Sequence, residues 1–237
     1  ITLWNLPVSS FAQLDGDDGN DTITLGSPAN VISGILGLVQ VNGGNHLAAP
    51  TMTESVTAKG NTITSTLPVG DTLNINDQAY AATAQYNLTD TMFDRDTTVA
   101  RTMYATIETI NLNVGTLAND INIINTPANS KTTVNSQGGA DDIDVTTTGS
   151  GSILIVNAAG GADLVDIATT GATSVTIING GDGADTLTQV TSGASSGVAL
   201  NGQGDTDTIT IQNAGATSSS LATGGAADDG ITLWNLL

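Results

Sequence analysis

The sequence predicts an all-β fold: a parallel β-helix, or solenoid, of about 22 residues per turn with three short strands in each turn. Residues of one type recur every 22 positions through 106–237, without insertion or deletion. Between the recurrences, apolar residues alternate with Thr, Asp and Asn, which is typical of strands. Helices are disfavoured because Gly, Thr, Asn and β-branched residues are dense and no amphipathic run is capped.

Four ladders of one residue type define the period in 106–237. The Asp ladder consists of Asp141, Asp163, Asp185, Asp207 and Asp229, and Asn119 lies one period before it. The Asn ladder consists of Asn113, Asn135, Asn157, Asn179 and Asn201. The Ser ladder consists of Ser130, Ser152, Ser174, Ser196 and Ser218, and the Gly ladder of Gly149, Gly171, Gly193 and Gly215. We expect these Gly residues, and Gly139, Gly161 and Gly183 at another corner, to supply positive φ at turns.

Three apolar positions recur in each period and predict the core and the three strands. The first set is Leu112, Val134, Val156, Ile178, Leu200 and Ala222. The second is Ile121, Ile143, Val165, Leu187, Ile209 and Ile231. The third is Ile123, Val145, Ile167, Ile211 and Leu233, interrupted by Gln189.

Residues 1–25 are predicted to form one more turn of the same repeat. Ile1-Thr2-Leu3 and Ile23-Thr24-Leu25 are 22 residues apart. Between them, Ser10, Leu14, Asp15 and Asp21 occupy the Ser, apolar, Asn and Asp positions of the period. Asp21 is therefore expected to belong to the Asp ladder.

The hexapeptide at 1–6 recurs without change at 231–236. A second copy placed at this offset of 230 residues would put its Asp21 and Ser10 22 residues after Asp229 and Ser218. The short period therefore continues in phase across the long one. We expect a solenoid that continues beyond the chain, as a tandem array or through abutting ends. The predicted assembly ends are Ile1, Thr2, Leu3 and Trp4, and Ile231, Thr232, Leu233 and Trp234.

Residues 26–105 are less regular. Asp21 and Asn119 are four periods and ten residues apart, so we expect about four turns that carry loops or a side sheet. Tyr80, Tyr86, Tyr104, Arg95 and Arg101 gather here. The chain is thus divided into a first turn at 1–25, an irregular part at 26–105 and a regular part at 106–237.

The composition limits the partners. With 23 acidic and 4 basic residues, the net charge of −19 argues against nucleic acid and against anionic membrane surfaces. The absence of an apolar run of 18 residues argues against membrane insertion. There is no Cys, and aromatic residues make up only 3%, which suits a thin core repeated along an axis.

The Asn and Asp ladders have distinct physical interpretations. Equivalent residues of successive turns lie roughly 4.8 Å apart, so inward Asn side chains at a corner can pass hydrogen bonds along the column. Stacked carboxylates at that spacing repel one another unless they are compensated. Backbone N–H groups are one compensation, which needs no metal. Bound Ca²⁺ is the other, with Asp21 and the Asp ladder as ligands.

Two runs resemble the glycine-rich nonapeptide of RTX, or haemolysin-type, calcium-binding proteins. They are Gly16–Thr24, which departs at Asp17, and Gly180–Thr188, which follows the pattern throughout. RTX calcium sites need such nonapeptides in immediate succession, whereas here each occurs once per 22 residues. The resemblance therefore carries over the corner and not the complete site.

A wider resemblance covers most of the chain. The runs 70–77, 86–89, 107–113 and 119–123 are similar to patterns in very large bacterial cell-surface repeat proteins, which resemble adhesins. The resemblance implies a β-helix located outside the cell or on its surface.

The leading functional hypothesis is a structural repeat unit of an extracellular fibre, filament or stalk, whose partner is another copy stacked head to tail. The alternative is a cell-surface adhesin that binds glycans through loops of 26–105. An enzyme is not expected, because four scattered basic residues cannot serve acid polysaccharide cleavage and the laddered Asp residues follow from the fold. Outward Thr pairs also permit ice binding, although Asp142 and Asp144 interrupt the array.

Overall fold

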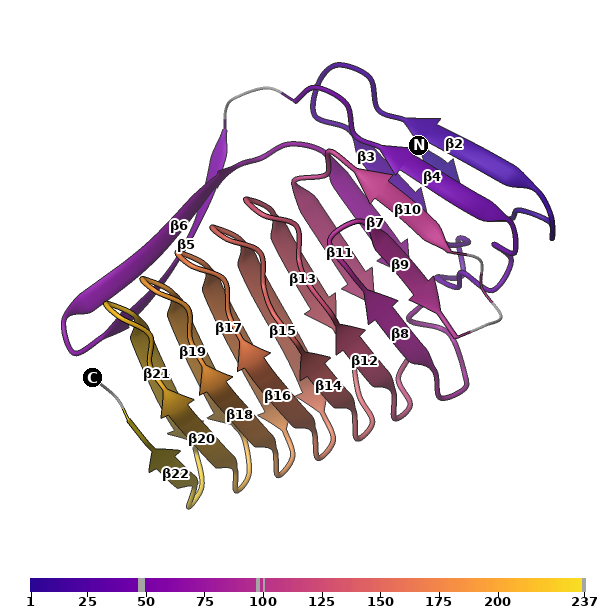
Figure 1. Cartoon of the computed structure of the whole chain (residues 1–237). Helices are drawn as coiled ribbons and strands as arrows, with labels where there is room; N and C mark the ends of the chain where they lie inside the picture. The colour runs from indigo at the N-terminus through magenta and orange to yellow at the C-terminus, as the bar shows by residue number, and fades with distance from the viewer. Residues whose placement is uncertain (47–49, 97–98, 100, 236–237) are drawn as a thin grey trace.

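The computed structural model describes residues 1–46, 50–96, 99 and 101–235, and confirms an all-β solenoid of about ten turns with roughly 22 residues per turn. Two long, mainly parallel sheets face each other across one thin core (Figure 1). We call the nine-stranded sheet the first sheet and the eleven-stranded sheet the second sheet. Within the described residues, no helix is long and apolar enough to cross a membrane.

The first sheet contains one strand from each regular turn. In spatial order it consists of β1 (Thr2–Leu3), β3 (Thr22–Leu25), β7 (Thr72–Asn76), β11 (Thr109–Asn113), β13 (Lys131–Asn135), β15 (Ile153–Gly160), β17 (Val175–Asp182), β19 (Gly197–Gln203) and β21 (Ser219–Gly225). All of its neighbours pair in parallel, and from β11 onward equivalent residues 22 apart lie side by side, as Val134 and Val156 do.

The second sheet contains the other strand of each turn and one antiparallel detour. In spatial order it consists of β2 (Phe11–Asp15), β4 (Leu38–Asn42), β10 (Thr102–Ala105), β9 (Met92–Arg95), β8 (Gln85–Leu88), β12 (Asp120–Ile123), β14 (Asp142–Val145), β16 (Leu164–Thr169), β18 (Thr186–Thr191), β20 (Thr208–Asn213) and β22 (Gly230–Leu233). The strand β9 runs antiparallel to both β8 and β10, and this detour adds two strands that the first sheet does not have.

Each regular turn of the described chain has two strands, so the expectation of three is wrong. The second and third apolar positions, such as Ile143 and Val145, are alternate residues of one strand and both point inward. Val134 faces them from the other sheet. The three recurring apolar positions therefore correspond to one inward residue on the strand of the first sheet and two inward residues on the strand of the second sheet.

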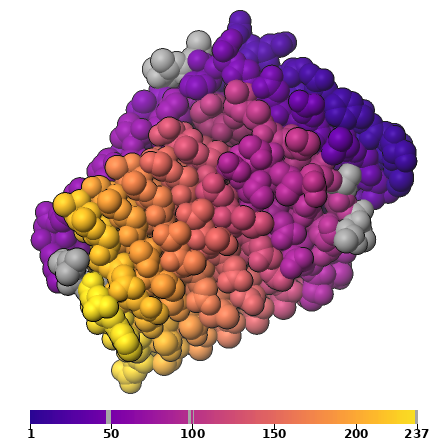
Figure 2. Space-filling model, in the orientation of Figure 1, coloured from indigo at the N-terminus to yellow at the C-terminus, as the bar shows by residue number. Residues whose placement is uncertain are grey.

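The irregular segment 26–105 supplies the side sheet that its sequence predicts. It is a hairpin of β5 (Thr51–Ala58) and β6 (Asn61–Pro68), joined by eight residue pairs in antiparallel register. The hairpin lies on the outer face of the first sheet, where Val56 and Leu67 pack against Ile153, Val175 and Ala199. Figure 2 shows this purple segment beside the yellow turns near the C-terminus.

The irregular segment also shifts the phase of the repeat by half a turn. Asp21 precedes β3 in the first sheet, whereas Asp141 precedes β14 in the second sheet. The expectation that Asp21 stands in the Asp ladder is therefore wrong. The physical reason is the interval of four periods and ten residues between Asp21 and Asn119, since ten residues carry the chain from one sheet to the other.

Candidate functional site: the acidic and amide ladders

The Asp ladder of 141–229 is a continuous hydrogen-bonded column beside the second sheet. The backbone N–H of each member from Asp141 to Asp207 donates to Oδ1 of the Asp one turn further along, at 2.8 to 2.9 Å. Asn119 heads the column and donates its N–H to Asp141 at 2.7 Å. Backbone N–H groups therefore bind one carboxylate oxygen per turn, as the metal-free interpretation requires.

The other oxygen of each carboxylate is uncompensated. Asp141, Asp163, Asp185 and Asp207 are at most 2% exposed, and among the described residues their Oδ2 atoms have no hydrogen-bond partner. Burial disfavours the charged form, and the next carboxylates in the column add repulsion. Burial accordingly raises the pKa of Asp163 to about 7 and that of Asp185 to about 6. It also raises the pKa of Asp141 and Asp207.

Small residues make room for the buried oxygens. Gly180, Gly202 and Gly224 each precede a ladder Asp by five residues, and a Cβ at any of them would collide with Oδ2 of that Asp. Ser136 and Ala158 occupy the same position in the two preceding turns. The Gly-rich corner that resembles an RTX motif is thus explained by the space that the carboxylate needs.

A second acidic ladder lies beside the first sheet and was not predicted as such. The N–H of Asp21 donates to Asp71 Oδ1 at 2.7 Å, and the N–H of Asp71 donates to Glu108 Oε2 at 2.8 Å. Asp71 is fully buried, its Oδ2 has no partner in the described chain, and burial raises its pKa. The intervals of 50 and 37 residues hide this ladder from a search at 22, although the run from Gly70 to Ile75 does resemble the Asp corner.

The geometry does not favour the calcium interpretation. Among the described residues, no three His, Cys, Asp or Glu side chains come together as a metal-binding group. Ca²⁺ prefers six to eight oxygen ligands, often with several carboxylates. The Asp ladder instead offers one free carboxylate oxygen per turn, and its Oδ1 atoms are already bound by backbone N–H groups. The raised pKa values favour protonated carboxyl groups in the column, and a protonated carboxyl group needs no such cage.

The Asn ladder is confirmed as a chain of side-chain hydrogen bonds. Each Nδ2 donates to Oδ1 of the Asn one turn earlier, at 2.7 to 3.0 Å, from Asn201 through Asn179, Asn157 and Asn135 to Asn113. The column continues to Asn76, which the period did not reveal. Asn113 and Asn135 end β11 and β13, whereas Asn157, Asn179 and Asn201 lie within β15, β17 and β19. All five are half-buried at outward positions, so the expectation that they point inward is wrong. Polar side chains at the rim keep access to water, which explains that orientation.

The Ser ladder closes the opposite corner together with Thr residues. Ser152, Ser174 and Ser196 each donate to the carbonyl of a Gly three residues earlier. Thr126, Thr148 and Thr170 donate to the Ser hydroxyl groups of the next turn and accept from the Gly N–H there. This corner is hydrogen-bonded, as a structural role requires. Its Gly residues, Gly149, Gly171, Gly193 and Gly215, do not have positive φ, so that expectation is wrong for them. A Cβ at any of them would collide with backbone atoms of the preceding turn, whereas Gly139, Gly161 and Gly183 do have positive φ.

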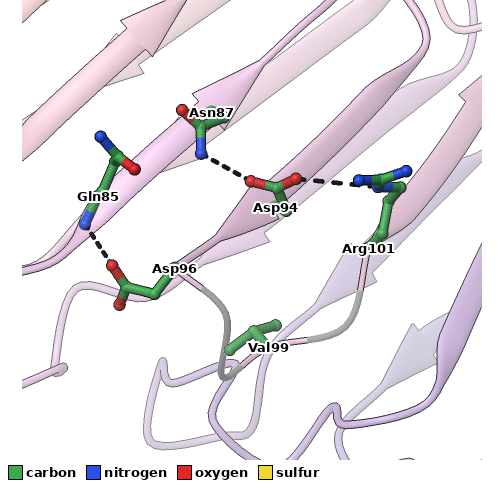
Figure 3. Close-up of a pocket in the computed structure, with 6 residues that line it drawn as sticks. All are labelled: Gln85, Asn87, Asp94, Asp96, Val99 and Arg101. Carbon is green, nitrogen blue, oxygen red and sulfur yellow. Dashed lines mark hydrogen bonds and ion pairs between the residues drawn. The ribbon is translucent and has the colours of Figure 1, made fainter.

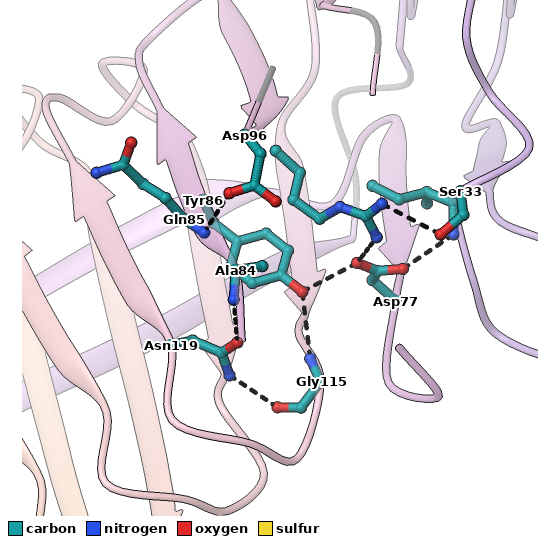
Figure 4. A network of polar contacts seen from close by, with 10 residues as sticks. Ser33, Asp77, Ala84, Gln85, Tyr86, Asp96, Gly115 and Asn119 are labelled. Atoms are coloured by element: carbon teal, nitrogen blue, oxygen red, sulfur yellow. Dashed lines mark hydrogen bonds and ion pairs between the residues drawn. The ribbon is translucent and has the colours of Figure 1, made fainter. Parts of the chain in front are cut away.

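The aromatic and basic residues of 26–105 form an internal network rather than a ligand surface. Arg95 Nη1 lies 2.5 Å from Asp77 Oδ2, which also accepts from the Tyr86 hydroxyl at 2.9 Å (Figure 4). The Arg95 guanidinium lies 3.8 Å from the centre of the Tyr80 ring. Arg95, Asp77, Tyr86 and Tyr104 are buried. A glycan could not reach most of the side chains that the sequence offered as candidates.

One open polar groove remains over the antiparallel detour of the second sheet (Figure 3). Its lining includes Gln85, Asn87, Asp94, Asp96 and Arg101. Asn87 donates to Asp94 at 2.8 Å, and Arg101 Nε lies 3.9 Å from the same carboxylate. These groups mostly satisfy one another, and no aromatic ring lines the groove to stack on a sugar.

The predicted assembly ends expose several large apolar side chains. Ile231 and Leu233 are 45% and 53% exposed, whereas Ile209 and Ile211 at the same positions one turn earlier are fully buried. Trp234 is 61% exposed, and Trp4 and Phe11 at the other end are 55% and 56% exposed. Core positions of the solenoid are therefore open at both end turns of the described chain.

Fold and ladders together define the chain as a β-solenoid whose polar columns serve its own architecture. Comparisons with models of protein families, with curated proteins and with solved structures find no match for the chain.

Proposed function

We propose that the chain is a structural repeat unit of an extracellular bacterial fibre or stalk, in which units stack head to tail through the ends of their solenoids. The observation that supports this proposal most is the hexapeptide of 1–6, which recurs at 231–236 in phase with the 22-residue period and contains the exposed Ile231 and Leu233. A following turn would bury both side chains and pair the free edge of β22.

Three further features favour a column that extends itself. An exposed strand edge presents unpaired N–H and C=O groups that pair with a matching strand. A contact between two different ends of one unit does not close on itself and generates a filament. The hexapeptide shared by the two ends supplies strands that fit the same neighbour.

Electron microscopy of the purified protein tests the proposal. About ten turns at roughly 4.8 Å give an axial rise of very roughly 50 Å per unit. We expect unbranched fibres with that rise, and we expect them to persist when calcium is chelated, because the Asp ladder is bound by backbone N–H groups. Monomers under all conditions would refute head-to-tail stacking. Fibres that dissolve only in chelator would restore calcium as the compensating ligand.

The structure gives the adhesin alternative less support. The polar groove of Figure 3 is the candidate site for glycan recognition by 26–105, whereas Tyr86, Tyr104 and Arg95 are buried. Glycan binding lost on changing Asp94 and Arg101 together would favour this alternative over the fibre.

A further inference from the structure

The two acidic ladders lie beside different sheets and run to opposite ends of the column. Asp21, Asp71 and Glu108 precede strands of the first sheet, starting from the N-terminal end. The ladder from Asp141 to Asp229 precedes strands of the second sheet and reaches the C-terminal end. The shared hexapeptide shows the same exchange, since β1 lies in the first sheet and β22 in the second.

We propose that successive units stack with a rotation of half a turn about the column axis, so that the second sheet of one unit continues into the first sheet of the next. In this arrangement β22 displaces β1 of the following unit and lies beside β3 in its place. The inference rests on the proposed head-to-tail stacking and specifies its register.

The pairing within one unit provides the register of the junction. Thr2 and Leu3 of β1 lie opposite Thr24 and Leu25 of β3. Residues 231–233 have the same sequence as residues 1–3, so Thr232 and Leu233 fit opposite the same partners in the following unit. Leu233 would then cover Leu25, and Ile231 would cover Ile23. The apolar residues that are exposed at the end of one unit thereby continue the core of the next.

The other sheet gives the same register independently. When β22 takes the place of β1, β21 lies beside β2 of the following unit. Residues of β21 then face residues of β2 that stand 22 positions later in the continued sequence. Ala222 then faces Leu14, and both are half-buried positions that pack against the core. Leu221 faces Gln13, and both are exposed. Inward residues therefore meet inward residues throughout.

The half-turn rotation also joins the two acidic ladders end to end. Among the described residues, the backbone N–H of Asp229 has no acceptor. One period further along stands Asp21 of the following unit, whose own N–H already donates to Asp71. If the units stacked with like sheets aligned, the column of Asp229 would instead meet Ser10, which precedes β2. Only in the rotated arrangement is the carboxylate of Asp229 followed by another carboxylate, that of Asp21.

Cysteine cross-linking tests the register, because the chain has no Cys of its own. The variant with Leu221→Cys and Gln13→Cys places its thiols together only in the rotated register. The matched control with Leu221→Cys and Thr2→Cys places them together only when like sheets are aligned, since Thr2 belongs to β1. In both variants the two positions lie at opposite ends of one unit, so a short bifunctional thiol reagent can link only different copies.

We expect the first variant to form a ladder of cross-linked oligomers and the control to stay monomeric on a denaturing gel. Cross-linking of the control, alone or together with the first variant, would overturn the half-turn register while leaving head-to-tail stacking intact. Fibres in the micrographs without cross-linking of either variant would overturn the register as well. If neither fibres nor cross-links formed, the proposed function would fail and the register with it. In fibres, the rotation predicts a true repeat of two units, roughly 100 Å.

Discussion

The backbone N–H of Asp163 donates to Oδ1 of Asp185 one turn further along at 2.9 Å, while Oδ2 of Asp185 has no partner within the described chain. Half of each buried carboxylate is thus satisfied and half is not. The satisfied half fixes the spacing of the turns. The unsatisfied half makes the stability of the column depend on protonation.

The column should become less stable as the pH rises from about 4 to about 7. Burial raises the pKa of Asp163 from 3.8 to about 7, so the folded chain binds more protons than the unfolded chain within that window. The unfolding free energy then falls with rising pH, and each unit of pKa difference corresponds to about 1.4 kcal/mol. Thermal unfolding should give a melting temperature several degrees higher at pH 5 than at pH 8. A flat profile, or one that rises with pH, would contradict the buried ladder.

Asp163→Asn should stabilise the protein at pH 8 by about 1 to 2 kcal/mol and weaken its pH dependence, because the buried charge disappears. An amide already occupies this column, since Asn119 Nδ2 donates to the carbonyls of Gly115 and Leu117. Ala159 and Gly161 occupy the equivalent positions relative to residue 163. Asp142→Asn, which removes an exposed charge nearby, is the matched control. It only weakens the repulsion on Asp144 and should change the pH profile less than Asp163→Asn. Urea unfolding at pH 5 and pH 8 measures both variants.

Gly202→Ala should destabilise the solenoid by about 1 to 3 kcal/mol, because the new methyl group collides with the Asp207 carboxylate in a closely packed corner. Gly160→Ala provides a control two turns away, where the nearest atom to a Cβ, the Asp182 carbonyl oxygen, is 3.9 Å away. Melting temperatures of the two variants should therefore differ clearly. Equal losses would mean that these glycines serve something other than space for the carboxylate.

Arg95→Met should cost about 3 to 5 kcal/mol, because it leaves the fully buried Asp77 carboxylate without its cation. Arg101→Met removes an exposed guanidinium 3.9 Å from Asp94 and should cost less than about 1 kcal/mol. Denaturant unfolding compares the two. A mild effect of Arg95→Met would show that the network in Figure 4 tolerates an uncompensated acid.

Periodicity reveals the regular half of the fold because each turn contacts only its neighbours and repeats their environment. The inward positions of Val134, Ile143 and Val145, and the bonded Asn column, follow directly from that repetition. From the sequence alone, two inward apolar residues on one strand are hard to distinguish from one inward residue on each of two strands. Ile143 and Val145 are two residues apart in either case, and a tight turn between them is excluded only by the observed pairing with Val165 and Ile167.

The half-turn shift could not be predicted from the ladders alone. Glu108 and Asn119 lie 11 residues apart, and this half period appears only when both are placed beside their sheets. Asp77 and Arg95 are unique in the sequence pattern, so nothing periodic marks them as a buried pair. The hairpin's position over distant turns depends on apolar contacts between residues far apart in the chain, such as Val56 and Val175.

The hairpin gives the column a mechanical property that a simple stack does not have. Glu54 in β5 pairs with Lys131, and Asn61 at the start of β6 accepts from Ser219 Oγ and donates to the carbonyls of Thr217 and Ser218. The hairpin of β5 and β6 therefore spans the turns from β13 to β21 along the axis. A pulling force on the last turns is shared by the hairpin instead of opening one ladder of hydrogen bonds after another. Peeling from that end must shear the hairpin off the first sheet, so these turns yield together under load.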